Sequence, residues 1–204
     1  HRGWSVIDVT DPSDPRPVAF HPGPANTWTA QANVADGLLV AGLARIPPQW
    51  GGDPDRPFDE AVAVLDVRDP LRPREVSTIR LGGTGAHRSF WSGGRYAYLA
   101  ANAEGFAHYL LVIVDLAASA VPREVGRFWL PGQGPGEERP SAEAGVSLHG
   151  PPYVVGDRAY CAWGGAGMVI VDVADPAAPR LVSRFSVSPP FNGGLYGAGV
   201  HTVR

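Results

Sequence analysis

Short apolar runs separated by polar turns recur along the whole chain. The runs are rich in valine, isoleucine and leucine, and residues of the Asp-Pro, Gly-Gly and Asp-Gly type bound them. Such runs predict strands rather than helices. The 26 glycines and 21 prolines point the same way, because glycine loses backbone entropy in a helix and proline lacks the N–H that a helix needs. The pattern predicts an all-β protein.

One motif, an apolar strand followed by Asp, a variable turn, Pro and Arg, occurs four times. The copies are WSVIDVTDPSDPRPV at 4–18, VAVLDVRDPLRPREV at 62–76, LVIVDLAASAVPREV at 111–125 and MVIVDVADPAAPRLV at 168–182. Their aspartates, Asp8, Asp66, Asp115 and Asp172, are separated by 58, 49 and 57 residues. This period suits a repeated four-stranded sheet. Each Asp ends a strand before a turn, so we expect it to accept hydrogen bonds from turn N–H groups.

Each motif supplies two strands, one before the Asp and one after the Arg, and two further strands precede it. The preceding pairs are TAQANV with GLLVAG, HRSFW with RYAYLAA, and HGPPYVV with RAYCAW. Four antiparallel strands per unit is the blade of a β-propeller. The predicted units are a half blade at 1–24, blades at 25–83, 84–132 and 145–188, and the start of another at 200–204.

The third copy contains the letters LVIVD at 111–115, and the chain resembles the LVIVD-repeat propellers over nearly all of its length. The resemblance implies a ring, often of seven blades, of which about three and a half are present. We therefore expect further blades, and the true N-terminus, in sequence outside these residues. The family is functionally diverse, so the resemblance implies architecture and no particular activity.

Long connections gather on one face of the predicted ring. They are 45–60, between the second and third strands of a blade, and the stretches near 131–146 and 186–199 between blades. Long loops in compact domains commonly carry function. This face is the predicted surface for a small-molecule ligand or a protein partner.

Three histidines, His87, His149 and His201, stand at the starts of innermost strands in successive blades. Innermost strands line the central channel, so the three imidazoles are expected to converge at its mouth. Three imidazoles with an open position are a common ligand set for a transition metal such as Zn or Fe. Two alternatives remain open: a hydrogen-bonded polar lining that recognises an anionic or polar small molecule, and isolated structural histidines.

Other ligand-binding candidates lie on the same face. The blade at 25–83 has no histidine at the corresponding place, where Asn26, Trp28 and Gln31 stand instead. Arg88, beside His87, is a candidate partner for a substrate carboxylate. His108 lies in a second-to-third connection. Two functions follow: a small-molecule site at the channel mouth, metal-centred and enzymatic in its strongest form, or a non-catalytic scaffold that binds another protein.

Charge and composition argue against several other classes of protein function. The net charge is −3 and the basic residues are scattered arginines, with no lysine, so nucleic acid binding is not expected. No apolar stretch approaches the length of a membrane span. We expect a soluble protein, with the cytoplasm slightly favoured. The nucleophile-elbow motif is absent and the single cysteine, Cys161, falls within a predicted strand, so whether the protein is an enzyme stays open.

Overall fold

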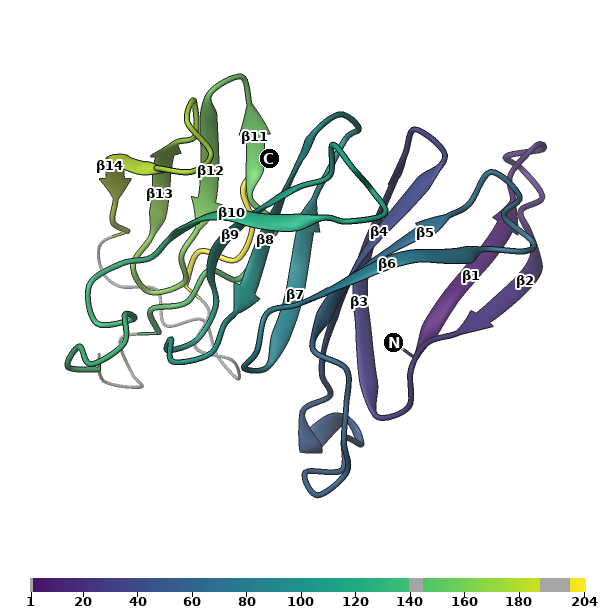
Figure 1. Cartoon of the computed structure of the whole chain (residues 1–204), viewed down its shortest axis with the longest axis horizontal. Coiled ribbons are helices and arrows are strands. Elements are labelled where there is room, and N and C mark those ends of the chain that lie inside the picture. Colours follow the sequence, from purple (N-terminus) through teal and green to yellow (C-terminus); the bar gives the residue numbers. More distant parts are fainter. Residues whose placement is uncertain (1, 140–144, 188–198) are drawn as a thin grey trace.

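The computed structural model describes residues 2–139, 145–187 and 199–204. The strands are antiparallel throughout this part of the chain, and its one helical turn is the 3-10 segment Pro48–Trp50. The all-β prediction is confirmed. Figure 1 shows the sheets following one another along the chain, each turned relative to the last, as the blades of a partial β-propeller are.

The strands group as blades. The first group is a two-stranded sheet of β1 (Gly3–Asp8) and β2 (Arg16–Pro22). The second group is β3 (Thr27–Ala35), β4 (Leu38–Arg45), β5 (Ala61–Asp66) and β6 (Arg74–Arg80). The third is β7 (Gly85–Phe90), β8 (Tyr96–Asn102), β9 (Leu110–Asp115) and β10 (Arg123–Phe128). The fourth is β11 (Tyr153–Val155), β12 (Arg158–Ala162), β13 (Met168–Asp172) and β14 (Arg180–Phe185).

Consecutive blades touch at the ends of their inner strands. Ala44 of β4 pairs with Gly85 of β7, which joins the second and third blades into one sheet at this point. The fourth blade meets the last described residues through a bridge between Gly164 and Val200. The number of blades in the ring stays a prediction.

The four motif copies share one pairing register. In each copy the Asp is opposite the Arg that follows the turn, and the strand pair then shifts by one residue at a β-bulge. Each Asp accepts a hydrogen bond from the N–H two residues later. The aspartates therefore hold turns, as the sequence predicted.

The Asp copies differ in burial and in charge partners. Asp115 is 4% exposed and accepts hydrogen bonds from the guanidinium of Arg95, which lowers the pKa of Asp115 to about 2. Arg68 and Arg74 pair with Asp66 in the same way. Asp8 is exposed and bonds only Thr10 within the motif. We therefore expect the same turn to contribute differently to the free energy of unfolding in different blades.

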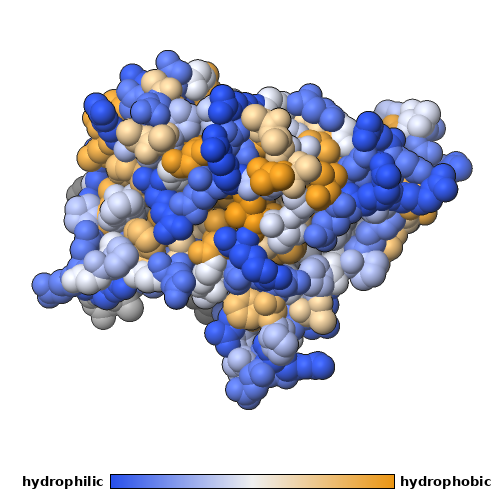
Figure 2. Space-filling model, in the orientation of Figure 1, coloured by the Kyte–Doolittle hydropathy of each residue, from blue (hydrophilic) through white to orange (hydrophobic). Residues whose placement is uncertain are grey.

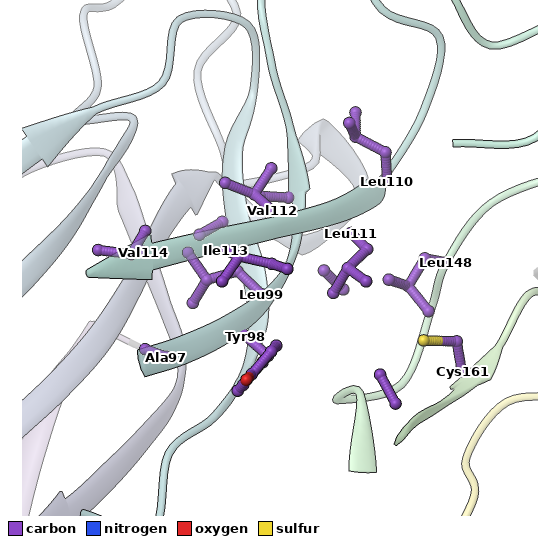
Figure 3. Packing of buried hydrophobic residues seen from close by; sticks show 14 of the residues in the cluster. Ala97, Tyr98, Leu99, Leu110, Leu111, Val112, Ile113, Val114, Leu148 and Cys161 are labelled. Carbon is purple, nitrogen blue, oxygen red and sulfur yellow. The ribbon is translucent and has the colours of Figure 1, made fainter. Parts of the chain in front are cut away.

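The main core lies between the third and fourth blades and extends into the second. Buried residues of β8 and β9 face those of the next blade, and Figure 3 shows Leu111 on the same side as Leu148 and Cys161. Leu111, Leu148 and Cys161 have no exposed surface. Outer strands are far more exposed, and every residue of β14 is exposed. Blade-to-blade packing of the inner strands therefore provides the apolar burial that stabilises the fold.

One predicted strand is shorter than expected. The stretch HGPPYVV forms a strand only at Tyr153–Val155. Pro151 and Pro152 have no N–H to donate to the neighbouring strand, so they end the pairing. His149 consequently lies in an extended segment before β11, tied to the blade by its own N–H, which donates to the carbonyl of Ala162 at 3.0 Å.

The long connections leave the blades on one side. Loop 45–60 extends below the sheets in Figure 1, and the connection after β10 lies on the same side. Figure 2 shows apolar side chains near the middle of this view and hydrophilic ones at the tip of the protruding loop. Residues 140–144 and 188–198 of the two blade-to-blade connections lie outside the described residues. Within the part that is described, no helix is long and apolar enough to cross a membrane.

Replacement of the buried motif aspartate tests its structural role. Asp115→Ala removes the acceptor for the Ala117 N–H and for Arg95, so we expect the free energy of unfolding to fall by about 2 kcal/mol. The exposed copy, Asp8→Ala, is the matched control and is expected to lose less stability than Asp115→Ala. Urea unfolding of both variants measures the difference. Equal losses would contradict the argument that burial sets the contribution.

Candidate functional site

His87 is placed by an irregularity in the innermost strand of the third blade. The β7–β8 register shifts between Ala86 and Arg88, so His87 is the extra residue of a β-bulge. Bulges re-aim side chains. Gly85, two residues earlier, has a φ of +89°, and a Cβ there would lie 2.2 Å from the carbonyl oxygen of Leu43. Only glycine permits this close approach of the second and third blades, which brings His87 beside the neighbouring blade.

His149 and His201 meet because two backbones approach closely. A Cβ on Gly150 would lie 2.3 Å from the carbonyl oxygen of His201. Val200 exchanges two hydrogen bonds with Gly164, with N···O distances of 3.0 and 3.1 Å. These contacts fix residues 199–202 against the fourth blade, and the imidazole of His201 then lies next to that of His149.

The aromatic side chains of these blades form a continuous row. We call Trp28, His87, Tyr109, His149 and His201 the ring row. His87 is stacked on Tyr109, with centroids 5.1 Å apart and an interplanar angle of 11°, and lies 4.8 Å from Trp28. His87 and His149 are 5.4 Å apart, and His149 and His201 are 4.1 Å apart. The structure therefore brings together histidines that are 62 and 52 residues apart in the sequence.

Burial keeps two of these imidazoles neutral. Desolvation lowers the pKa of His87 to about 3, with smaller contributions from Arg88, His149 and His201. Desolvation also lowers the pKa of His149 to about 4, followed by the charges of His201 and Arg88. At neutral pH both rings therefore carry one N–H donor and one acceptor nitrogen. His87 is 4% exposed, and its Nδ1 has no hydrogen-bond partner among the described residues.

The remaining candidates take different positions. Asn26 supports loop 45–60: its amide donates to the carbonyls of Asp53, Arg56 and Pro57 and accepts from the Asp53 N–H. The hydrogen bonds of Asn26 therefore hold loop 45–60, and ligand binding by Asn26 stays a prediction.

Trp28 belongs to the ring row and also lies 4.7 Å from Trp50 of loop 45–60. Gln31 follows a shift of register in β3, and its Oε1 is buried without a partner among the described residues. His108 is exposed and has a φ of 57°, and its carbonyl oxygen accepts a hydrogen bond from Asn102. No ring contact joins His108 to the ring row in the described part of the chain.

Two residues of the site were not identified from the sequence. Tyr109 immediately precedes the LVIVD strand and packs on His87. Gln133, fully buried, accepts hydrogen bonds from Leu130 N and Trp163 Nε1 and donates to the carbonyls of Ala107 and Tyr109. Gln133 thus links the third and fourth blades and fixes the backbone of Tyr109. Its position in a Gly-Pro-rich loop gives no signal of this role.

Two cavities lined by described residues lie away from the ring row. One of about 270 Å³, between the first and second blades, is lined by residues that include Trp4, His21 and Leu65. A smaller one, of about 140 Å³, lies beside Gly164 and Val200. Neither is lined by a member of the ring row. We nevertheless place the candidate site at the ring row, because polar and aromatic groups of three blades converge there.

No set of three or more His, Cys, Asp or Glu side chains in the described ranges is arranged to hold a metal ion. The imidazoles follow one another in a row, whereas a single metal needs their nitrogens to point to one atom at about 2.0 to 2.1 Å. Metal binding at His87, His149 and His201 therefore stays a prediction.

The lowered histidine pKa values predict acid sensitivity. The unfolded chain takes up protons near the ordinary pKa of about 6.5, whereas folded His87 and His149 resist protonation. The free energy of unfolding therefore has its full value above about pH 6.5. It falls as the pH drops toward about 4, by at most about 1.4 kcal/mol per pH unit for each histidine. Urea unfolding at pH 7, 6 and 5 measures the slope. His87→Gln is expected to reduce it by about half, and an unchanged slope would show that His87 is protonated normally.

The comparison with known families bears on the blades that carry this site. The LVIVD repeat model matches residues 84–129 and 153–187, which contain β7–β10 and β11–β14 respectively. No curated protein matches the chain. The two matched ranges agree with the shared register of the motif copies, and repeats of this family form propellers. The chain therefore contains LVIVD repeats at residues 84–129 and 153–187, and its described part has the fold of a partial β-propeller.

Proposed function

We propose that this protein binds a small ligand at the ring row, at the end of the propeller axis where the innermost strands begin. The observation that carries the proposal is the continuous contact of the imidazoles of His87, His149 and His201 with one another and with two larger aromatic rings. Sites for small molecules commonly combine aromatic walls with a few convergent polar groups. The ring row has both.

Burial at one end of the row and exposure at the other support this proposal. His87 is buried, His149 is half-buried and His201 is exposed. A ligand entering from the His201 end would meet polar nitrogens in order of increasing burial. His87 Nδ1 lacks a partner in the described residues, and a buried polar atom without a partner costs about 1 to 3 kcal/mol. A ligand atom that pairs with it offsets this cost.

Catalysis at the row would depend on the imidazoles. A neutral imidazole can accept a proton, but the lowered pKa values of His87 and His149 make both of them weak bases at neutral pH. Cys161, by contrast, is fully buried, and burial raises the pKa of its thiol. A covalent step through that thiol has no support, because the thiolate is the reactive form.

Transition-metal binding is the second candidate. Its supporting observation is the short distance of 4.1 Å between the ring centroids of His149 and His201. Neutral imidazoles such as that of His149 are the form that metals bind. A shared metal requires the two rings to turn so that one nitrogen of each points to the same atom.

Native mass spectrometry of protein purified without chelators tests the proposal, together with elemental analysis of its metal content. We expect the wild-type protein to carry an additional mass that is lost from the His149→Gln, His201→Gln double variant. His108→Gln, outside the ring row, is the matched control and is expected to retain the mass. Stoichiometric metal would favour the second candidate. An additional mass that persists in the double variant would contradict binding at the row, and no added mass would favour the protein-binding scaffold.

A further inference from the structure

Arg88 is a half-buried cation that no described group neutralises. It follows the bulge residue His87 in β7. Within the described residues, its guanidinium makes no hydrogen bond and no ion pair. Burial lowers its pKa, and the one titratable group whose charge opposes that shift is Tyr109. An arginine remains charged in proteins even so, so this charge lies in a partly desolvated place without a counter-ion among the described residues.

The other arginines show how unusual this is. Most of them pair with an Asp or Glu or donate to a backbone carbonyl, as Arg95 does to Asp115 and Arg139 to Gln133. The remaining arginines without either kind of contact in the described chain are fully exposed, where water solvates them; these are Arg56, Arg180 and Arg204. Arg88 alone combines partial burial with the lack of a partner among the described groups.

Arg88 stands directly beside a member of the ring row, at the bulge. In a regular strand, neighbouring side chains point to opposite faces. The extra residue at His87 interrupts this alternation. Arg88 directly follows His87 in the chain, and its positive charge contributes to the lowered pKa values of His87 and His149. A fixed positive charge thus accompanies several uncharged donors.

We propose that the ligand of the ring row is a small organic monocarboxylate, whose carboxylate pairs with the guanidinium of Arg88. This inference rests on the proposed function. The planar guanidinium fork matches the two oxygens of a carboxylate. An imidazole N–H or the Tyr109 hydroxyl supplies a further uncharged donor, and the aromatic faces contact the body of the ligand.

The single positive charge of Arg88 favours a ligand that carries a single negative charge. A single guanidinium, with His87 and His149 uncharged, neutralises one negative charge. A phosphate monoester carries between one and a half and two negative charges, roughly, at neutral pH. It would leave excess negative charge in a partly desolvated place, which is costly. A carboxylate leaves none.

Three probes that share a phenyl ring separate these possibilities: benzoate, the uncharged benzamide and the dianionic phenyl phosphate. Binding of each is measured by calorimetric titration at neutral pH. We expect benzoate to bind about tenfold more tightly than benzamide and phenyl phosphate. Arg88→Met is expected to weaken benzoate binding by about tenfold and to abolish the preference over benzamide. Arg56→Met, an exposed arginine without a partner, is expected to change neither.

Thermal unfolding separates a ligand-binding role from a structural one. Removal of an unpaired, half-buried charge should leave the unfolding temperature of Arg88→Met unchanged or raised. A large decrease would indicate that Arg88 stabilises the fold. Benzoate affinity that is unchanged in a folded Arg88→Met variant, or no binding of benzoate at all, would overturn the inference.

The outcomes also distinguish this inference from the proposed function. If benzoate and benzamide bind equally well and both are lost in His149→Gln, the site at the ring row stands and the monocarboxylate inference fails. If phenyl phosphate binds most tightly and needs Arg88, the ligand is an anion of higher charge and the inference also fails.

Discussion

Close approach of consecutive blades at the starts of their inner strands is the constraint on which the rest of this structure depends. Gly85 and Gly150 each permit a contact that any side chain would block. Behind these contacts lies the apolar core, where residues such as Leu111 and Leu148 are fully buried. The convergence of the three histidines is a consequence of that packing, because each stands next to such a contact.

Burial then determines the chemistry of the ring row. The imidazoles of His87 and His149 are neutral because charging them in a desolvated place is unfavourable. The positive charge of Arg88 disfavours their protonation further. The result is a set of uncharged donors and acceptors beside one positive charge. Gln133, in the connection between the third and fourth blades, supports this arrangement because its side chain accepts a hydrogen bond from Trp163 and donates one to the carbonyl of Tyr109.

Much of the fold could be predicted from the sequence, because the same pattern of strand and turn residues occurs four times. An apolar strand, an Asp that accepts turn N–H groups and an Arg at the next strand start are local features, and the structure confirms them in each copy. The predicted length of β11 was wrong because two prolines interrupt the pairing of strands. The positions of His87, His149 and His201 followed from the topology of a blade.

Finer details of the site could not be predicted, because they depend on contacts between distant segments. Asn26 turned out to support loop 45–60 through residues 27 to 31 positions away. The bulge at His87 breaks the alternation from which the direction of Arg88 would be deduced. Gln133 has no signature in its own loop, since its partners are backbone groups and the indole of Trp163.

Nitrogen-15 NMR of protein labelled at histidine, at about pH 5.5, tests the central claim most directly, because it reports the protonation of each ring. An ordinary histidine is mostly protonated there, since its pKa is about 6.5. Assignments come from single His87→Gln and His149→Gln variants. We expect the imidazoles of His87 and His149 to stay neutral, each with one protonated nitrogen. Two doubly protonated rings would show that the row is solvated, and would contradict a desolvated site built by the packing of successive blades.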